Sequence, residues 1–419
     1  MTSERRDLLD RFRATRAVSS WIAQPLAVED MVPQSMPDAS PTKWHLAHTT
    51  WFFETFVLRD ARPGEPDHHP DFNFLFNSYY NQVGPQFPRP ARGLVTRPTV
   101  ADVFSYRAHI EERLERFLQD ATEDDLDRFG PVVELGIHHE QQHQELMLTD
   151  LRHLLAQNPL LPAYRTEAAN QEAAALSGSA GWTGFEGGMS WIGHASHSFC
   201  FDNELPRHQT FLAPFQIANR PVTCADWLAF MEDGGYADPR PWLSDGWAVA
   251  QREGWNRPMY WLEGPSGWQV YTLRGVEPLS QDAPVCNVSF YEADAYARWA
   301  GARLPTEFEW EVACAARQAP GAFLDSGTLH PIAVESDGIA SMLGGVWEWT
   351  SSAYLGYPGY RAAEGAIGEY NGKFMSDQHV LRGGSVATPQ SHIRPTYRNF
   401  FPASVRWQFS GLRMARDGS

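Results

Sequence analysis

We predict that the chain combines an α-helical bundle with a separate α+β domain. Four long segments within the first 165 residues repeat apolar side chains three and four positions apart, which is typical of amphipathic helices in a bundle. Thirteen of the sixteen tryptophans lie from Trp182 onward, among many glycines, prolines and short strand-like runs. The stretch 166–181 is small, polar and free of aromatic residues, as linkers are. The predicted domains are therefore 1–165 and 182–419, joined by this linker.

The elements follow from local patterns. Helices of the first domain are expected, in chain order, at 3–23, 43–60, 99–121 and 131–158. Pro131 suits the first turn of the last helix, and Asn158-Pro159 suits its end. The crossover 61–98 exceeds ordinary loop lengths, and long ordered loops are usually functional. In the second domain we expect strands within 188–194, 211–218 and 379–387 and one long helix at 289–317.

Composition excludes some classes of partner. The formal charge of −17 argues against nucleic acid or an anionic membrane, since both require a basic surface. The chain shows no signal-peptide core and no run approaching the roughly 18 apolar residues of a membrane span. The four cysteines are far apart and form no C-x-x-C pair, which predicts a reduced, cytoplasmic protein. Oligomeric state is left open.

The segment "HHEQQHQEL", residues 138–146, is the strongest candidate for a functional site. On a helix, His139 and His143 share the apolar, inward face, and Gln142 borders it. Two buried imidazoles without partners are costly, so the pair is either bonded to core neighbours or bound to a metal ion. The second helix offers His45 and His48 as a third ligand. We favour His48, because His45 lies in the first turn, where exposure is commoner.

The same residues fit the H-E-x-x-H signature of zinc proteases. Glu140 lies about 100° around the helix from His139 and could line the edge of such a site. No third-ligand motif follows His143, and a second domain rich in tryptophan is foreign to that design, so we disfavour a protease. Imidazole suits zinc, iron, copper and nickel, so the ligand type does not select the metal.

Longer motifs carry a resemblance to a known family. "ASPTKWHLAHTTWFFETFVL", "FNSYYNQVG" and "HHEQQHQEL" resemble the DinB-like four-helix domain of the ergothioneine-pathway sulfoxide synthases. "ARLPTEFEWEVACAAR", "GGVWEWTSS", "VLRGGSVATP" and "FSGLRMARD" resemble the C-type-lectin-like fold of formylglycine-generating enzyme and sulfatase-modifying factors. The resemblance runs in order over nearly the whole chain. It implies a mononuclear non-haem Fe(II) enzyme that uses O2 to join sulfur to the imidazole C2 of hercynine (N-alpha-trimethylhistidine), giving a sulfoxide.

The resemblance also assigns residues. It implies that His48, His139 and His143 bind iron and that Gln142 hydrogen-bonds the substrate imidazole. It places Asn399 against hercynine and Phe400 near its trimethylammonium group, where an aromatic ring makes a cation–π contact.

Departures from the family pattern concern the sulfur donor. Members that use gamma-glutamylcysteine carry an aspartate where this chain has Phe401, and they take a tyrosine from the second domain that "IGEYNGKFMSDQ" does not match. The chain instead has Tyr79 and Tyr80 in the crossover, like members that use free cysteine. One of this pair would donate a proton or electron during the reaction. Arg89 and Arg92 would bind the carboxylate of cysteine.

Formylglycine chemistry is disfavoured, because 386–388 after "RGGS" lack cysteine. Three functions stay open. The leading one is a sulfoxide synthase acting on hercynine and cysteine. The second is a relative that joins a selenium donor, such as a selenosugar, to hercynine and gives selenoneine. The third is a non-catalytic DinB-like metal-binding module.

Overall fold

The computed structural model describes residues 3–166, 181–315, 318–319, 321–333 and 338–418. The chain divides into two compact units. The first comprises Met1–Tyr164 and Ala363–Tyr370, and the second comprises Arg165–Ala362 and Asn371–Ser419. The predicted linker 166–181 lies, apart from its two end residues, outside the described residues.

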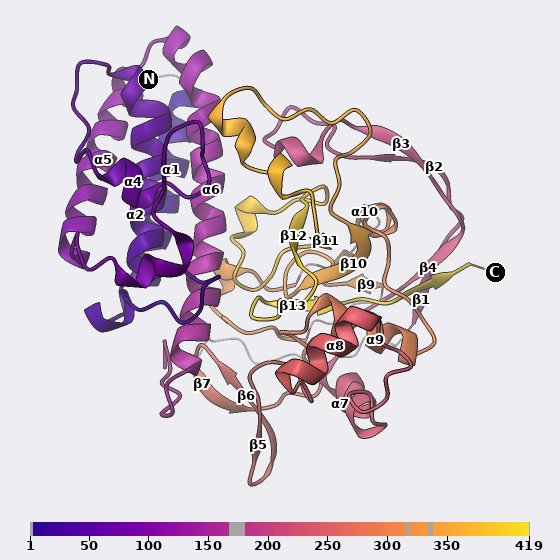
Figure 1. Ribbon diagram of the computed structural model, residues 1–419. Helices are drawn as coiled ribbons and strands as arrows, with labels where there is room; N and C mark the ends of the chain where they lie inside the picture. Colours follow the sequence, from indigo (N-terminus) through magenta and orange to yellow (C-terminus); the bar gives the residue numbers. More distant parts are fainter. Residues whose placement is uncertain (1–2, 167–180, 316–317, 320, 334–337, 419) are drawn as a thin grey trace. The chain divides into compact units, whose positions relative to one another are not determined.

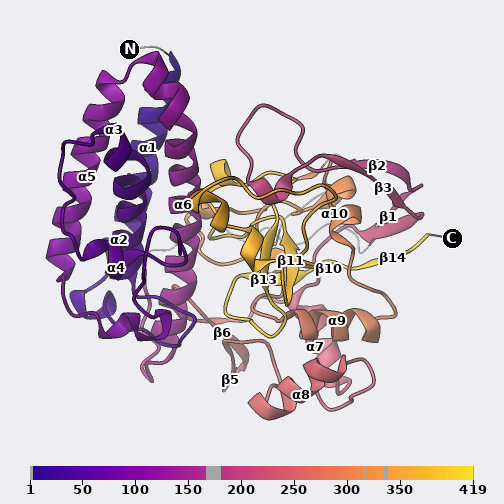
Figure 2. The ribbon, with the colours of Figure 1, turned by 45° about the horizontal axis from the view of Figure 1, so that its top comes forward.

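The first unit is the predicted bundle of four long helices. In chain order its helices are α1 (Ser3–Ala23), α2 (Thr42–Phe53), α3 (Arg59–Ala61), α4 (Phe72–Phe76), α5 (Val100–Asp120) and α6 (Glu123–Ala156). Figure 1 shows α1, α2, α5 and α6 running alongside one another, and Figure 2 shows the same arrangement from another direction. A π-helical turn at Glu54–Leu58 connects α2 to α3 without a break, so the predicted helix 43–60 is continuous.

The last helix begins earlier than we predicted. α6 starts at Glu123, and Pro131 lies inside it rather than in its first turn. The Thr122 hydroxyl accepts the N–H of Asp125 at 3.1 Å, and the Asp125 carboxylate accepts the N–H of Thr122 at 2.9 Å. This reciprocal cap stabilises the earlier start, while the proline removes one backbone hydrogen bond without ending the helix.

The second unit is an α+β fold of short strands. Its strands are β1 (Trp182–Phe185), β2 (Gly188–Ile192), β3 (His208–Leu212), β4 (Phe215–Ala218), β5 (Trp261–Gly264), β6 (Gly267–Thr272), β7 (Gly275–Pro278), β8 (Gln318–Ala319), β9 (Ile339–Ala340), β10 (Trp347–Ala353), β11 (Gln378–Arg382), β12 (Asn399–Pro402), β13 (Ser410–Leu412) and β14 (Ala415–Asp417). The largest sheet among the described residues has the strand order β12-β11-β10-β13, with β10 and β13 parallel. A second sheet has the order β1-β4-β14, in which the C-terminal strand β14 pairs antiparallel with β4.

The helices of the second unit differ from the single helix predicted at 289–317. They are α7 (Cys224–Glu232), α8 (Ser244–Glu253), α9 (Phe290–Trp299) and α10 (Glu307–Cys314). α9 and α10 are separate because Gly301 adopts a left-handed φ of 67° and Thr306 caps a new helix start with Glu309. α7 and α8 are too short for their periodicity to stand out in the sequence. No helix in the described part of the chain is both long and apolar enough to cross a membrane.

Candidate metal centre

Three histidines converge inside the bundle. α2 provides His48, and α6 provides His139 and His143, one turn apart on the face that packs against α2. All three rings are buried, and one nitrogen of each lies within 4.8 Å of the others. In the described ranges, this is the group of histidine, cysteine and carboxylate side chains that is close enough to hold a metal ion.

The hydrogen bonds of the rings identify the nitrogens that face the centre. His48 Nδ1 donates to the carbonyl oxygen of Phe76 at 2.5 Å, which leaves the lone pair on Nε2. His48 Nε2 lies 3.2 Å from His139 Nε2. Two nitrogens bound at about 2.1 Å to one ion, roughly at right angles, lie about 3 Å apart, so this spacing fits a shared metal. A direct hydrogen bond between these two rings would account for their spacing but not for the position of His143 beside them.

Burial prepares these rings for metal binding. It lowers the pKa of His48 and of His143 well below the ordinary value of 6.5, and the neighbouring histidines act in the same direction. Burial lowers the pKa of His139 to about 3, although the Glu140 charge opposes it. A metal ion binds the neutral imidazole, so no proton has to leave at neutral pH. Three neutral imidazoles fit a divalent transition metal but do not by themselves select iron.

Glu140 does not line this site, contrary to the geometric expectation. Its carboxylate accepts hydrogen bonds from Arg107 Nη2 at 2.6 Å, Arg16 Nη1 at 2.9 Å and Ser19 Oγ at 2.6 Å. These partners lie on α5 and α1, toward which Glu140 points because it lies about 100° around α6 from His139. Glu140 is therefore a buried anchor of the bundle, and the zinc-protease hypothesis loses the residue that would act as general base.

Tyr79 and Tyr80 lie in the crossover loop with their rings 4.7 Å apart. Tyr80 is buried, and its ring is 5.8 Å from that of Trp51, which stacks on His48 at 5.6 Å. A side-chain hydrogen bond joins the two phenols. Burial raises the pKa of both hydroxyls, that of Tyr79 well above 10, so both hold their protons at neutral pH. The pair is thus one ring removed from the histidines.

The segment 363–370 brings a third tyrosine into the first unit. The ring of Tyr370 lies 5.6 Å from that of His139 and 5.9 Å from that of Tyr79. The adjacent Glu369 carboxylate accepts the backbone N–H of Asn81 at 3.0 Å and that of Gln82 at 2.9 Å. The stretch "IGEYNGKFMSDQ", which our motif comparison set aside, therefore does deliver a tyrosine beside the histidines.

Arg92 is a buried cation without a carboxylate partner among the described residues. Its guanidinium donates to Ser40 Oγ and to Ser78 Oγ, each at 2.9 Å, while its Nε is buried with no partner. It lies 3.4 Å from the ring centroid of Trp44, which in turn stacks on His48 at 4.6 Å. Burial and the neighbouring Arg89 charge lower the pKa of Arg92 well below 12.5, although the Asp150 charge acts in the opposite direction.

The other substrate residues expected from the sequence lie in different places. Arg89 is exposed and donates to the backbone carbonyl of Asp38, so of the two arginines only Arg92 is buried. Gln142 is half-buried on α6, immediately before His143. In the second unit, β12 carries Asn399 and Phe400 and also Phe401, the last half-buried and 6.5 Å from Trp407 in ring separation.

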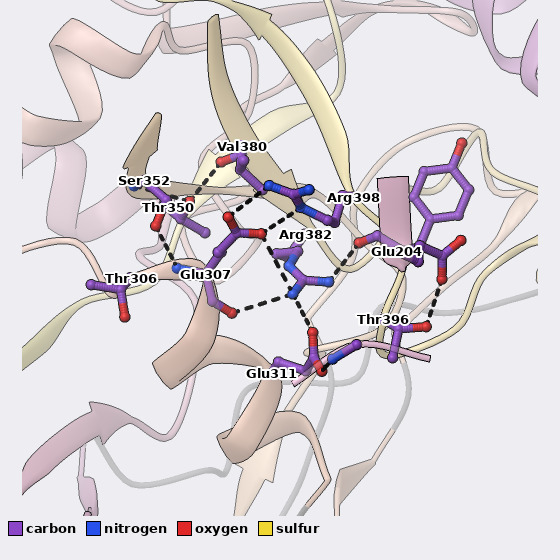
Figure 3. A network of polar contacts seen from close by, with 12 residues as sticks. Glu204, Thr306, Glu307, Glu311, Thr350, Ser352, Val380, Arg382, Thr396 and Arg398 are labelled. Atoms are coloured by element: carbon purple, nitrogen blue, oxygen red, sulfur yellow. Dashed lines mark hydrogen bonds and ion pairs between the residues drawn. The ribbon is translucent and has the colours of Figure 1, made fainter. Parts of the chain in front are cut away.

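A buried ion-pair network fixes the start of β12, as Figure 3 shows. The Arg398 guanidinium donates to both carboxylate oxygens of Glu307, at 2.7 and 2.9 Å, and to the carbonyl oxygen of Asn203 at 2.8 Å. Phe400, two residues later, stacks on Tyr354 at 4.0 Å. A bidentate pair of this kind sets backbone position more firmly than a single hydrogen bond, so β12 presents its side chains on a rigid support.

Sequence reasoning misjudged the burial of one residue beside the centre and missed another. His45 was expected to be exposed but is only 2% exposed, because every residue of α2 is buried. Six of the twelve residues of this helix are threonine, lysine or histidine, so its composition does not reveal that it is buried on all sides. Tyr370 left no signal either, because only the folded path of the chain brings it beside residues more than 200 positions earlier.

Comparisons with known proteins agree with both halves of the chain. Models of two families match it: the DinB superfamily over residues 11–147, and the sulfatase-modifying factor enzyme 1-like domain over 184–336 and 332–418. A hercynine oxygenase of Mycolicibacterium smegmatis is 34% identical over 92% of this chain and 92% of its own length. One of Mycobacterium tuberculosis is 35% identical, over 91% of this chain and 92% of its own. Ergothioneine biosynthesis protein 1 of Schizosaccharomyces pombe is 27% identical over 52% of this chain and 28% of its own.

Proposed function

The chain belongs to the hercynine oxygenase family, and we propose that it joins the sulfur of free cysteine to C2 of the hercynine imidazole and oxidises that sulfur to a sulfoxide. The membership confirms the family resemblance of the motifs and identifies an oxidative enzyme of the ergothioneine pathway. The observation that carries the choice of cysteine is Arg92, a buried and unpaired cation next to the three histidines.

The proposed reaction balances with O2 as the sole oxidant. Hercynine loses the hydrogen on C2, and cysteine loses the hydrogen on sulfur. Forming the C–S bond removes two electrons, and converting the thioether sulfur to a sulfoxide removes two more. O2 accepts all four electrons, and one of its oxygen atoms enters the sulfoxide while the other leaves as water. Simple dioxygenation of cysteine to its sulfinate consumes the same oxidant and is the competing outcome.

We propose that His48, His139 and His143 hold Fe(II). A ferrous ion with three imidazole ligands supplies open positions for a thiolate and for O2. The chain's own groups then set the course of the reaction. Tyr79, protonated at neutral pH, is the donor we assign, with Tyr80 as its hydrogen-bonded partner.

Two further elements are assigned to hercynine. Gln142, half-buried beside His143, is proposed to hydrogen-bond its imidazole. Asn399 on β12 is proposed to help hold hercynine, and Phe400 to pack near its trimethylammonium group, where the ring face attracts a cation.

Arg92 also separates the candidate donors. Cysteine brings a carboxylate that can accept from the guanidinium in a buried site, and such charge-assisted bonds are the strong ones. A selenosugar brings no carboxylate and would leave the cation unpaired. The chain lacks the acidic side chain that would pair with the ammonium group of a dipeptide donor, because it has Phe401 at that position. Free cysteine is therefore the donor that fits best.

The direct test offers each donor separately. Protein reconstituted with Fe(II) under anaerobic conditions is mixed with hercynine and O2 and then with cysteine, gamma-glutamylcysteine or a selenosugar, and products are identified by mass. We expect hercynylcysteine sulfoxide with cysteine as the preferred product. Preferential C–Se product would reassign the donor, and no product with any donor would leave a non-catalytic metal-binding module.

Replacing Arg92 by methionine tests the donor pocket. We expect the KM for cysteine to rise at least about 30-fold, since losing one partner of a buried charge pair costs about 2 kcal/mol or more. The KM for hercynine should change little. The matched control is Arg89→Met, an exposed arginine whose loss should change the KM for cysteine less than about 5-fold. Equal effects of the two substitutions would remove Arg92 from the donor site.

Replacing the loop tyrosines by phenylalanine tests the proton donor. We expect Tyr79→Phe to shift the product from sulfoxide toward cysteine sulfinate, because the donor that favours C–S bond formation is gone. Tyr80→Phe should change the ratio less, since its ring packs in the core against Trp51 and Phe56. Tyr370→Phe is measured in the same way, because the ring of Tyr370 also lies beside His139. The ratio of the two products is read by mass spectrometry, and an unchanged ratio in Tyr79→Phe and Tyr80→Phe contradicts the assignment.

A further inference from the structure

A relay of hydrogen bonds between buried side chains leads from His143, one of the three histidines, through His45 to Asp150. His143 Nδ1 lies 2.8 Å from His45 Nδ1, and His45 Nε2 lies 3.1 Å from Asp150 Oδ2. The same carboxylate oxygen accepts the backbone N–H of Ser40 at 2.8 Å. His45 belongs to α2, whereas Asp150 and His143 lie two turns apart on α6, so the contacts tie the two ligand-bearing helices together.

The positions of the protons along this relay follow from which atoms can donate a hydrogen bond and which can accept one. An ionised carboxylate only accepts, so His45 Nε2 carries a hydrogen and donates to Asp150. His45 Nδ1 of the neutral ring then has a lone pair and accepts from His143 Nδ1. His143 consequently carries its hydrogen on Nδ1, and its lone pair is on Nε2, the nitrogen that remains to face His48 and His139.

The reverse arrangement is incompatible with ligation. If His45 donated from Nδ1, the neutral His143 ring would carry its hydrogen on Nε2 and present no lone pair to a metal. The direction of both hydrogen bonds in the relay therefore depends on the acceptor at its far end, which is Asp150.

We infer that Asp150, acting through His45, is a positioning device that fixes the tautomer and ring orientation of His143 for metal binding. The phenomenon is known in general for metal-bound histidines, whose second nitrogen is commonly held by a carboxylate or carbonyl. Here a second imidazole stands between the two. His48 has the simpler version, with the Phe76 carbonyl as direct acceptor. This inference rests on the metal centre proposed above.

Nitrogen NMR of histidine side chains tests the inference without any substitution. In the Zn(II)-loaded protein, we expect His143 to carry its proton on Nδ1 and its metal on Nε2, and His45 to be protonated on Nε2 alone. A proton on His45 Nδ1, or metal on His143 Nδ1, overturns the relay while the metal centre stands. Failure of the three histidines to bind Zn(II) at all would instead overturn the metal centre, and the relay with it.

Metal affinity provides the second readout, with Co(II) alone as the probe. We expect Asp150→Asn and His45→Phe each to weaken Co(II) binding about 10- to 100-fold, as loss of such supporting partners typically does. The matched control is His153→Phe, a buried histidine on the same helix that bonds Ser35 Oγ at 2.7 Å and should leave the affinity unchanged. Unchanged affinity in both relay variants, with the Co(II) absorption spectrum also unchanged, rules the relay out.

Discussion

Replacing any one of His48, His139 and His143 by alanine should abolish both metal binding and sulfoxide formation. Each ring supplies one of the three neutral nitrogen donors of the proposed centre, and removing one leaves only two imidazoles to hold the ion. Supporting residues of metal sites already contribute about 10- to 100-fold, so loss of a direct ligand should exceed 100-fold. Iron content after anaerobic reconstitution, Co(II) titration and product mass are the measurements.

The control for this experiment is built into the same helix. His138 precedes His139 on α6 but lies on a different face of that helix. Its Nε2 is 3.5 Å from Arg11 Nη2 on α1. His138→Ala should therefore bind one metal ion per chain and form product at near the original rate. Stoichiometric iron in one of the three ligand variants, or its loss in the His138 variant, would show that the ion sits elsewhere.

The broad architecture was predictable because it depends on local patterns. Long amphipathic repeats predicted the bundle, and the change in composition at Trp182 predicted a second kind of fold. The two His139 and His143 rings were placed on one inward face by helical spacing alone, and the structure has them there. Such inferences succeed because a helix fixes the relative direction of side chains four residues apart.

The parts that could not be predicted depend on contacts between distant residues. Pro131 is a strong local signal for a helix start, yet the cap at Thr122 and the packing of α6 outweigh it. The predicted helix 289–317 is two helices, because Gly301 turns the chain and Thr306 starts it again. Tyr370 reaches the histidines only through the path of segment 363–370, which no periodicity encodes.

The two faces of one helix explain why H-E-x-x-H is misleading in this chain. The histidines of the motif face α2 and the proposed metal centre, whereas its glutamate faces two arginines on α1 and α5. One short sequence thus provides candidate metal ligands toward α2 and an anchor of the bundle toward α1 and α5. A rigid anchor is what a metal site needs, since ligands must be held close to their productive geometry.

Glu140→Gln should accordingly lower the free energy of unfolding of the bundle by about 3–5 kcal/mol, because breaking a buried ion pair leaves its partner charge uncompensated. Glu140 is fully buried between Arg16 and Arg107, and the amide would also turn an N–H donor toward a guanidinium. Urea denaturation followed by helical circular dichroism measures the change. Glu134→Gln is the control, since that glutamate pairs with Arg11 near the surface and should contribute less than about 1 kcal/mol.

The pH dependence of the unfolding free energy tests whether the negative charge of Glu140 causes this stabilisation. Burial alone would raise the pKa of Glu140, but Arg107 and Arg16 outweigh it and lower the pKa to about 2 from the ordinary 4.5. A carboxylate with a lowered pKa in the folded state stabilises the fold fully above the ordinary value, and this contribution is lost as pH falls through the folded value. The difference in unfolding free energy between the original protein and Glu140→Gln should therefore be largest at neutral pH and shrink from about pH 4.5 toward pH 2. A difference that stays constant over this range would instead indicate that the substitution acts through packing alone.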